Sequence, residues 1–305
     1  LHGKRNKLRV IIVEMEFYHR FVPEQENHHI IRVAILDLYN NEPNEGMRGI
    51  QTILNQQDIP APFQLRWERF DVRFKEEIPD DSFDIYISSG GPGSPLEEPG
   101  ARWEIEYFKL IDKLWEHNKS DDASKKFIFF ICHSFQLMCR HLDLADVVKR
   151  HSTAFGIFPV HKTEEGQTEK CFAKLPDPFF AVDSRDWQVI QPNDEQMEKI
   201  GAKLLAIEKD RPHVPYERAV MSIRFSPEMI GTQCHPEADP VGMLHYLLRT
   251  DKKDIVVKHH GQEKYDEMLL HLNDPDKINL TQSSLIPAFL EDAIRKIVQQ
   301  VKVNA

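Results

Sequence analysis

A cysteine, a histidine and a glutamate stand where their side chains could act together on a carbonyl group. Cys132 follows the apolar run Phe127–Ile131 and comes directly before a pattern of helical spacing. A thiol on such a strand-to-helix turn is activated by the N–H groups and the dipole of the helix start, which is the geometry of a nucleophile elbow. The thiol needs a base, and the base needs a group that orients it. His235 and Glu237, at the end of a later apolar segment, are the candidates.

Taken alone, Cys132 is also compatible with an inert core position, because free cysteine is among the residues most often buried. The elements around it favour a functional site. Apolar runs predict strands at Ile31–Leu38, Phe63–Val72, Phe83–Ile87 and Phe127–Ile131, and helical spacing predicts helices at Met47–Leu54 and Trp103–Trp115. Strands that alternate with helices predict an α/β fold with a mostly parallel central sheet and helices on both faces. In such folds the active site lies at the carboxyl ends of the strands, where Cys132 is found.

The second half of the chain has a different pattern of predicted elements. Short strand-like pieces occur at Thr153–Val160, Cys171–Ala173, Phe179–Val182, Val189–Ile190, Lys203–Ile207, Ala219–Arg224 and Met229–Gln233. Their spacing predicts an antiparallel sub-sheet that leads back to His235. Helical patterns follow at Val241–Leu248, Tyr265–Leu272 and Ile286–Val301. We therefore expect an N-terminal extension of open role (1–30), a main domain (31–240) and a C-terminal helical extension (241–305).

Composition excludes several classes of protein. The formal charge of −10 argues against a general nucleic-acid surface, and no apolar run approaches the length of a membrane span. The four cysteines (Cys132, Cys139, Cys171 and Cys234) show no CxxC spacing, so neither a metal site nor a disulfide framework is expected. A reduced thiol and the lack of a recognisable signal peptide predict a cytoplasmic protein.

Three short motifs follow one another along the chain, and both their residues and their order are informative. They are Ser89-Gly90-Gly91-Pro92-Gly93-Ser94-Pro95, then Ile131-Cys132-His133-Ser134-Phe135-Gln136, then Gln233-Cys234-His235-Pro236-Glu237. Together they resemble the class I glutamine amidotransferase family, and in particular its stand-alone glutaminase domains of the GMP-synthase type, over roughly residues 31–240. The resemblance implies a flavodoxin-like three-layer sandwich and no cofactor. It also implies that the amide of glutamine, or of a γ-glutamyl compound, is cleaved through a cysteine thioester.

The resemblance also assigns roles to residues. Cys132 would be the nucleophile, His235 its base and Glu237 the group that orients the base. The substrate-binding residues would be Gly91 and His133, whose N–H groups would hold the oxyanion, together with Gln136, Ser184, Arg185 and Trp187. The segment Asp183–Trp187 falls where the family carries a Ser-His-Gly-Asp-like loop around the substrate. Arg185 takes the histidine position there, so it is either a clamp for a carboxylate or part of an ordinary loop.

The elbow itself departs from the family, which usually has glycine two residues before and two residues after the cysteine. This chain has Phe130 and Ser134 at those positions. Homoserine O-acyltransferases share the fold and tolerate a larger residue there, so acyl transfer from acyl-CoA is one alternative. Against it, no lysine occupies Asn40–Gly46, where those enzymes carry one. A degenerate regulatory module is another alternative, although the Cys-His-Glu set is intact.

The resemblance leaves the partners open. Either a separate synthetase subunit receives the ammonia, or the chain is a stand-alone γ-glutamyl hydrolase. The helical extension is compatible with a docking surface, a lid or a contact in a homo-oligomer.

Overall fold

The computed structural model describes residues 29–97, 99–120, 124–272 and 274–303. A nine-stranded sheet in the order β2-β1-β3-β4-β9-β8-β7-β5-β6 runs through it. The strands are β1 (His29–Asp37), β2 (Phe63–Asp71), β3 (Ile85–Ser88), β4 (Phe127–Ile131), β5 (Asp146–Lys162), β6 (Phe179–Ile190), β7 (Lys203–Glu208), β8 (Val220–Ser226) and β9 (Met229–Thr232). The pairings from β2 to β9 are parallel, and those from β9 to β6 are antiparallel. The flavodoxin-like α/β class is thus confirmed, whereas the predicted N-terminal extension, up to residue 28, lies outside the described residues.

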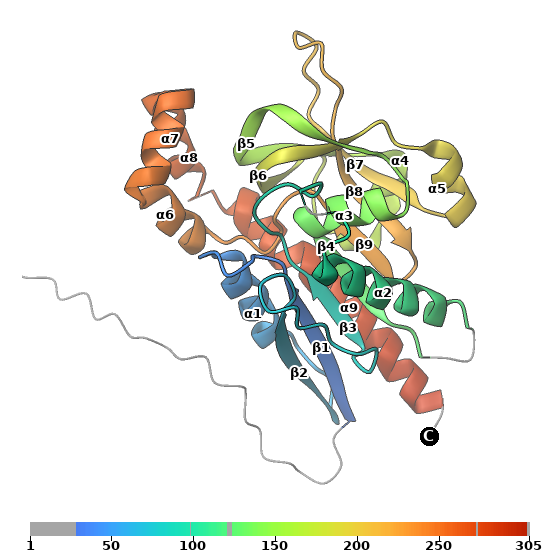
Figure 1. Cartoon of the computed structure of the whole chain (residues 1–305). Helices are drawn as coiled ribbons and strands as arrows, with labels where there is room; N and C mark the ends of the chain where they lie inside the picture. The colour runs from blue at the N-terminus through green and yellow to red at the C-terminus, as the bar shows by residue number, and fades with distance from the viewer. Residues whose placement is uncertain (1–28, 98, 121–123, 273, 304–305) are drawn as a thin grey trace, which may run out of the picture.

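Helices cover both faces of the parallel half (Figure 1). The helices are α1 (Gly46–Gln56), α2 (Arg102–Asn118), α3 (His133–His141), α4 (Glu164–Thr168), α5 (Asp194–Ile200), α6 (Pro240–Leu248), α7 (Thr250–His260), α8 (Gln262–His271) and α9 (Leu280–Val303), with a 3₁₀ turn η1 (Lys170–Phe172) and a π turn η2 (Pro275–Asn279). Phe127, Phe129 and Ile131 of β4 pack in the core shared with α1 and α9. Ile128 and Phe130 point to the opposite face, into the core shared with α2 and α3. Burial on both faces explains why β4 is apolar at every position.

The C-terminal extension divides between two places. Helix α9 packs on the sheet through Leu285, Phe289 and Leu290, so it forms part of the three-layer core. Helices α6, α7 and α8 lie together at one side of the molecule, beside β5 and β6 (Figure 1). They form a third apolar cluster with Ile157 and Val182 of those strands.

The predicted antiparallel sub-sheet is present, but two of its details differ. The pieces Phe179–Val182 and Val189–Ile190 belong to the single strand β6. Buried Asp183 and Arg185 between them form an ion pair, and this polar interruption hides the continuity of the strand in the sequence.

The prediction of a strand at Cys171–Ala173 is wrong, because Lys170–Phe172 is the 3₁₀ turn η1. The Glu169 carboxylate accepts the Cys171 N–H at 3.0 Å and pairs with Arg224 at 2.5 Å. This cap stabilises a turn locally, and Phe172 reaches the core from it without joining a strand.

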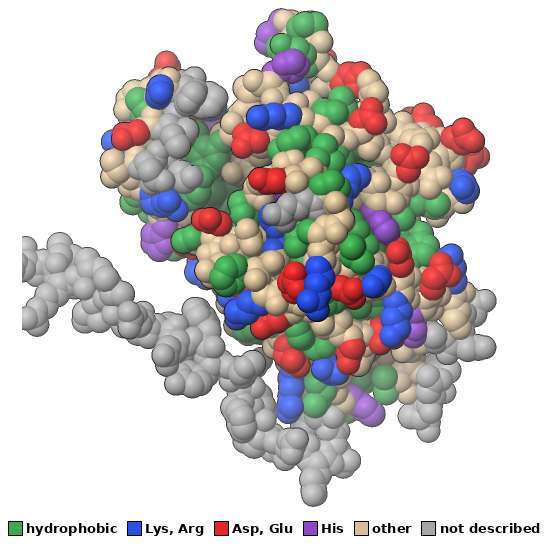
Figure 2. Space-filling model, in the orientation of Figure 1, with side chains coloured by type: hydrophobic (Ala, Val, Ile, Leu, Met, Phe, Trp, Pro, Cys, Tyr) green, Lys and Arg blue, Asp and Glu red, His purple; other side chains and the backbone are tan. Residues whose placement is uncertain are grey.

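The surface in view carries charges of both signs. Figure 2 shows Lys and Arg side chains interspersed with Asp and Glu across this face. Salt screens the interactions between such exposed charges beyond a Debye length of about 8–10 Å. Among the helices of the described ranges, none combines the length and apolar character that crossing a membrane requires.

Phe130, which replaces the usual glycine before the elbow, fits because a glycine faces it from the next strand. Phe130 is fully buried and pairs in register with Gly231 of β9. A methyl group on Gly231 would lie 2.8 Å from Phe135 Cδ2, 3.0 Å from Phe225 Cε2 and 3.1 Å from Phe130 Cβ. The close approach that the family obtains with a glycine before the cysteine is therefore obtained here with a glycine across the strand pair.

We expect Gly231→Ala to destabilise the protein by about 1–3 kcal/mol, since the added methyl overpacks three aromatic neighbours. Equilibrium unfolding in urea measures this loss as a lower midpoint at an unchanged slope. An unchanged midpoint would show that the neighbours of Gly231 yield freely and that this glycine does not make room for Phe130.

Candidate active site

Cys132 occupies a strained turn between β4 and α3. Its backbone has φ 47° and ψ −95°, a conformation that residues other than glycine seldom adopt. Two groups hold the turn in place. The Cys132 N–H donates to the Thr232 carbonyl at 2.7 Å. The Ser134 hydroxyl accepts the Ile131 N–H and donates to the Ser88 carbonyl, both at 2.8 Å. Serine thus fits where the family has glycine, and it ties the elbow to β3.

His235 lies beyond the carboxyl end of β9, which pairs with β4. Its N–H donates to the Val182 carbonyl at 2.8 Å, and its Nδ1 lies 2.8 Å from Glu237 Oε1. Burial by itself lowers the pKa of His235, but the charges of Glu237 and of the Cys132 thiolate outweigh it and raise that pKa well above its usual value. The imidazole is therefore set to hold a proton next to the sulfur, the state that a Cys–His ion pair requires.

Helix α1 fixes the backbone of Glu237. A methyl group on Gly49 would come within 2.2 Å of the Glu237 carbonyl oxygen, so only glycine permits this approach. The Glu237 side chain is 1% exposed. Its position is consequently set by packing against α1 as well as by its bond to His235.

The side-chain amides of Gln136 and Gln233 form a hydrogen-bonded chain that ends at the sulfur of Cys132. Gln233 Nε2 lies 3.5 Å from Cys132 Sγ, within hydrogen-bonding distance. Gln136 Nε2 in turn donates to Gln233 Oε1 at 3.0 Å and to the Trp187 carbonyl at 3.2 Å. The side chains of Gln136 and Gln233 thus connect the sulfur of Cys132 to the backbone of β6. Gln233 belongs to the third motif but is not among the predicted site residues, although residues two apart on an extended segment point to the same side, as Gln233 and His235 do.

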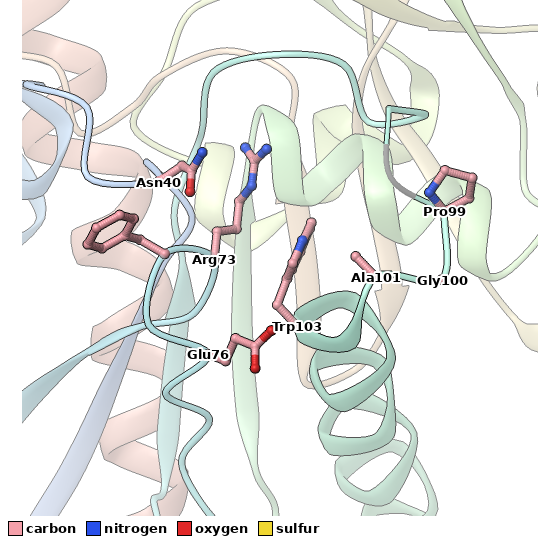
Figure 3. Close-up of a pocket in the computed structure, with 8 residues that line it drawn as sticks. Asn40, Arg73, Glu76, Pro99, Gly100, Ala101 and Trp103 are labelled. Carbon is pink, nitrogen blue, oxygen red and sulfur yellow. The ribbon is translucent and has the colours of Figure 1, made fainter.

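The glycine-rich loop after β3 is supported from below by Arg73. Its Nη1 donates to the Pro92 carbonyl at 2.8 Å, and its guanidinium lies 5.2 Å from the centre of the Trp103 ring. Figure 3 shows the two side chains next to each other in a separate cavity of about 530 Å³, which also receives Asn40 and Glu76. Arg73 therefore holds the loop that carries Gly91.

His133, the other residue expected to supply an oxyanion N–H, is the first residue of α3. Its ring is buried, and burial together with the charges of Arg73 and Arg140 lowers its pKa to about 3. The imidazole is thus neutral at ordinary pH, which makes it unsuited to act as a second proton carrier beside His235.

The segment predicted to cradle the substrate lies on β6 and passes close to the nucleophile. The Ser184 carbonyl oxygen is 4.0 Å from Cys132 Sγ. Arg185 is buried, with Nε 2.9 Å from both carboxylate oxygens of Asp183 and Nη2 3.6 Å from Glu208. Its charge is compensated within the protein, which weakens the case for a carboxylate clamp.

All nine predicted site residues line one cavity of about 890 Å³. They are Gly91, Cys132, His133, Gln136, Ser184, Arg185, Trp187, His235 and Glu237. The cavity also contains residues that the sequence did not indicate, among them Tyr39, Phe155, Met243 and Tyr246. Burial and, to a lesser extent, the charges of Glu237 and Cys132 raise the pKa of Tyr39 well above its usual value, so its phenol stays protonated beside these residues. In the described part of the chain, no group of three or more His, Cys, Asp or Glu side chains is arranged to hold a metal ion.

Comparison with known proteins assigns the chain to a family. The family model of class I glutamine amidotransferases matches residues 52–253, well over half of the chain. The chain belongs to the class I glutamine amidotransferase family. Among curated proteins, none matches the sequence significantly.

Solved structures share the fold of this amidotransferase at low identity. A glutamine amidotransferase from Thermotoga maritima is 16% identical with a TM-score of 0.60, over 88% of this chain and 99% of that one. A glutamine amidotransferase from Methylobacillus flagellatus is 13% identical with a TM-score of 0.58, over 89% and 96%. A protein from Thermoplasma acidophilum, described as a subunit of GMP synthase, is 17% identical with a TM-score of 0.52, over 91% and 99%.

We expect Glu237→Gln to lower the pKa of His235, because it removes the opposite charge next to the ring. The folded pKa lies above the value of about 6.5 of an unfolded histidine. The charged imidazole therefore stabilises the fold fully below that pH, and its contribution is lost as the pH rises through the folded pKa. NMR titration of the histidine ring carbons measures the shift, with the exposed Glu198→Gln as a control that leaves it unchanged. An unaltered His235 midpoint in Glu237→Gln would contradict the assigned pairing.

We expect Arg73→Met to reduce kcat by about 10–100-fold, since small displacements of catalytic groups have effects of that order. Methionine keeps an apolar stem against Trp103 but removes the donor to Pro92. KM should change far less than kcat, because the loop would act on the developing oxyanion and not on the bound ground state. Arg66→Met, at an exposed position of β2, is the control. A change in thermal stability with unaltered kcat would show that Arg73 is only structural.

Proposed function

We propose that the protein cleaves the side-chain amide of glutamine, or of a γ-glutamyl compound, through a thioester on Cys132. The thiolate attacks the amide carbonyl, and the C–N bond breaks as the leaving nitrogen takes a proton from His235. Water then attacks the thioester with His235 as its base, which releases glutamate and restores the thiol. Ammonia, or an amine, is the other product.

The remaining groups support the charged stages of this reaction. The N–H groups of Gly91 and His133 are the proposed donors to the oxyanion, and they come from a glycine-rich loop and a helix start. Glu237 keeps the proton of the imidazole on the correct nitrogen. Gln233 and Gln136 connect the sulfur of Cys132 with β6, the strand proposed to lie beside the substrate.

One observation carries the proposal. Cys132 lies at the carboxyl end of β4 and the His235–Glu237 pair lies beyond the carboxyl end of the adjacent β9, within a single cavity. Two distant parts of the sequence thus contribute the proposed nucleophile, base and orienting group to one cavity.

Acyl transfer from acyl-CoA is less well supported. That alternative depended on Phe130 at the elbow, and Gly231 makes room for this side chain without any change of chemistry. A degenerate regulatory module is disfavoured because the strained elbow, the His235–Glu237 bond and the donor to the sulfur are all present together.

The partners and the location stay predictions. A separate synthetase subunit would use released ammonia, whereas a stand-alone hydrolase would need none. Self-association is compatible with either case, and a cytoplasmic location suits the reduced Cys132 thiol.

The decisive variant is Cys132→Ala, for which we expect release of glutamate from glutamine to fall by about 10⁴–10⁶-fold with the fold retained. Cys139→Ala is the matched control, because Cys139 is a buried thiol on α3 whose pKa is raised by burial. We expect it to retain turnover. Glutamate release by Cys132→Ala at the wild-type rate would exclude the proposed chemistry.

A further inference from the structure

The cavity at Cys132 is larger than glutamine requires. Its volume is about 890 Å³. Glutamine has about ten non-hydrogen atoms, and at the roughly 30 Å³ that a water-sized group occupies in a liquid it would fill on the order of 300 Å³. Most of the cavity would then stay available for another part of the substrate.

The lining of the cavity includes charged side chains, among them Glu42 and Asp186, but on one side it is an apolar wall. This wall consists of Phe155 of β5, Met243 and Tyr246 of α6, and Val256 of α7. The Phe155 and Tyr246 rings lie 5.0 Å apart, and Met243 and Val256 are 7% and 3% exposed. Met243, Tyr246 and Val256 follow the last of the three motifs in the sequence, and Met243 and Tyr246 still lie inside the region 52–253 that the family model matches. The wall is therefore distinct from the residues of the three motifs.

The wall is held in place by polar contacts outside it. Asp239 caps α6 through the Gly242 N–H at 2.7 Å, and Arg48 of α1 grips the Asp239 carboxylate with two bonds of 2.7 and 2.9 Å. At the other end of α6, the Tyr265 hydroxyl of α8 donates to the Leu247 carbonyl at 3.0 Å. A preformed apolar surface of this kind binds a ligand without a large ordering cost.

We propose that the preferred substrate is a γ-glutamyl amide whose nitrogen carries an apolar group, and that this group packs on the apolar wall. The inference rests on the proposed function, since the glutamyl part must lie at Cys132. The bond that breaks is the amide C–N bond. The amine leaves with the proton of His235, and water then converts the thioester to glutamate.

The size of the expected preference follows from ordinary apolar packing. A single methylene in a hydrophobic pocket changes kcat/KM by about 10–200-fold. An N-substituent that fills the space beside the wall should therefore raise kcat/KM at least about tenfold over a substituent too short to reach it.

The test compares γ-glutamyl methylamide with γ-glutamyl cyclohexylmethylamide, with glutamine alongside, and measures glutamate, the common product. Both are alkylamides with amines of similar basicity, so their intrinsic reactivity is matched. We expect the cyclohexylmethylamide to have the higher kcat/KM by at least about tenfold. Met243→Gln should lower this ratio by about tenfold, and Phe155→Ala, on a different element, should lower it as well. Leu244→Gln, at a 40% exposed position of the same helix, should leave it unchanged.

The outcomes separate the inference from the proposed function. Equal kcat/KM for the two amides, or an unchanged ratio in both wall variants, would overturn the inference while glutamate release still upheld the function. Failure of the wild-type protein to release glutamate from any of the three compounds would overturn the function and the inference together.

Discussion

The parallel pairing of β4 with β9 is the constraint on which the site depends. It places the carboxyl ends of two strands side by side, although about a hundred residues separate them in the sequence. The bond from the Cys132 N–H to the Thr232 carbonyl continues this pairing into the elbow, so the turn that carries Cys132 is held by the strand that leads to His235. The energetic cost of the left-handed backbone at Cys132 is met by this bond and by the Ser134 hydroxyl.

The same pairing explains how the chain departs from its family without losing the elbow. Two neighbouring strands leave room for one large side chain, and it does not matter which of them supplies the glycine. Here Phe130 fills the space and Gly231 provides it. Packing and charge act together at Glu237 as well. Glu237 lies between α1 and His235, so packing sets the geometry and the carboxylate sets the protonation of the imidazole.

Much of this was predictable from short-range pattern. The five apolar residues of β4, the spacing of α2 and the resemblance carried by the three motifs located most of the strands, the elbow and nine of the residues that line the cavity. The sequence pattern failed where polar side chains interrupt a strand or cap a turn. Buried Asp183 and Arg185 concealed the continuity of β6, and the cap from Glu169 turned Cys171–Phe172 into a 3₁₀ helix. Tyr39 and Met243 enter the cavity through tertiary packing, which no local pattern encodes.

The central claim is that Cys132, and no other thiol of the chain, carries the γ-glutamyl group. The most direct measurement is mass spectrometry of the cysteine peptides. The protein is mixed with glutamine, the reaction is quenched in acid within its first turnovers, and the protein is digested before the mass of each cysteine peptide is measured. The account predicts one γ-glutamyl group on the Cys132 peptide and its removal by hydroxylamine, as expected of a thioester. An adduct on the Cys139, Cys171 or Cys234 peptide, or one formed from an acyl-CoA and never from glutamine, would contradict it.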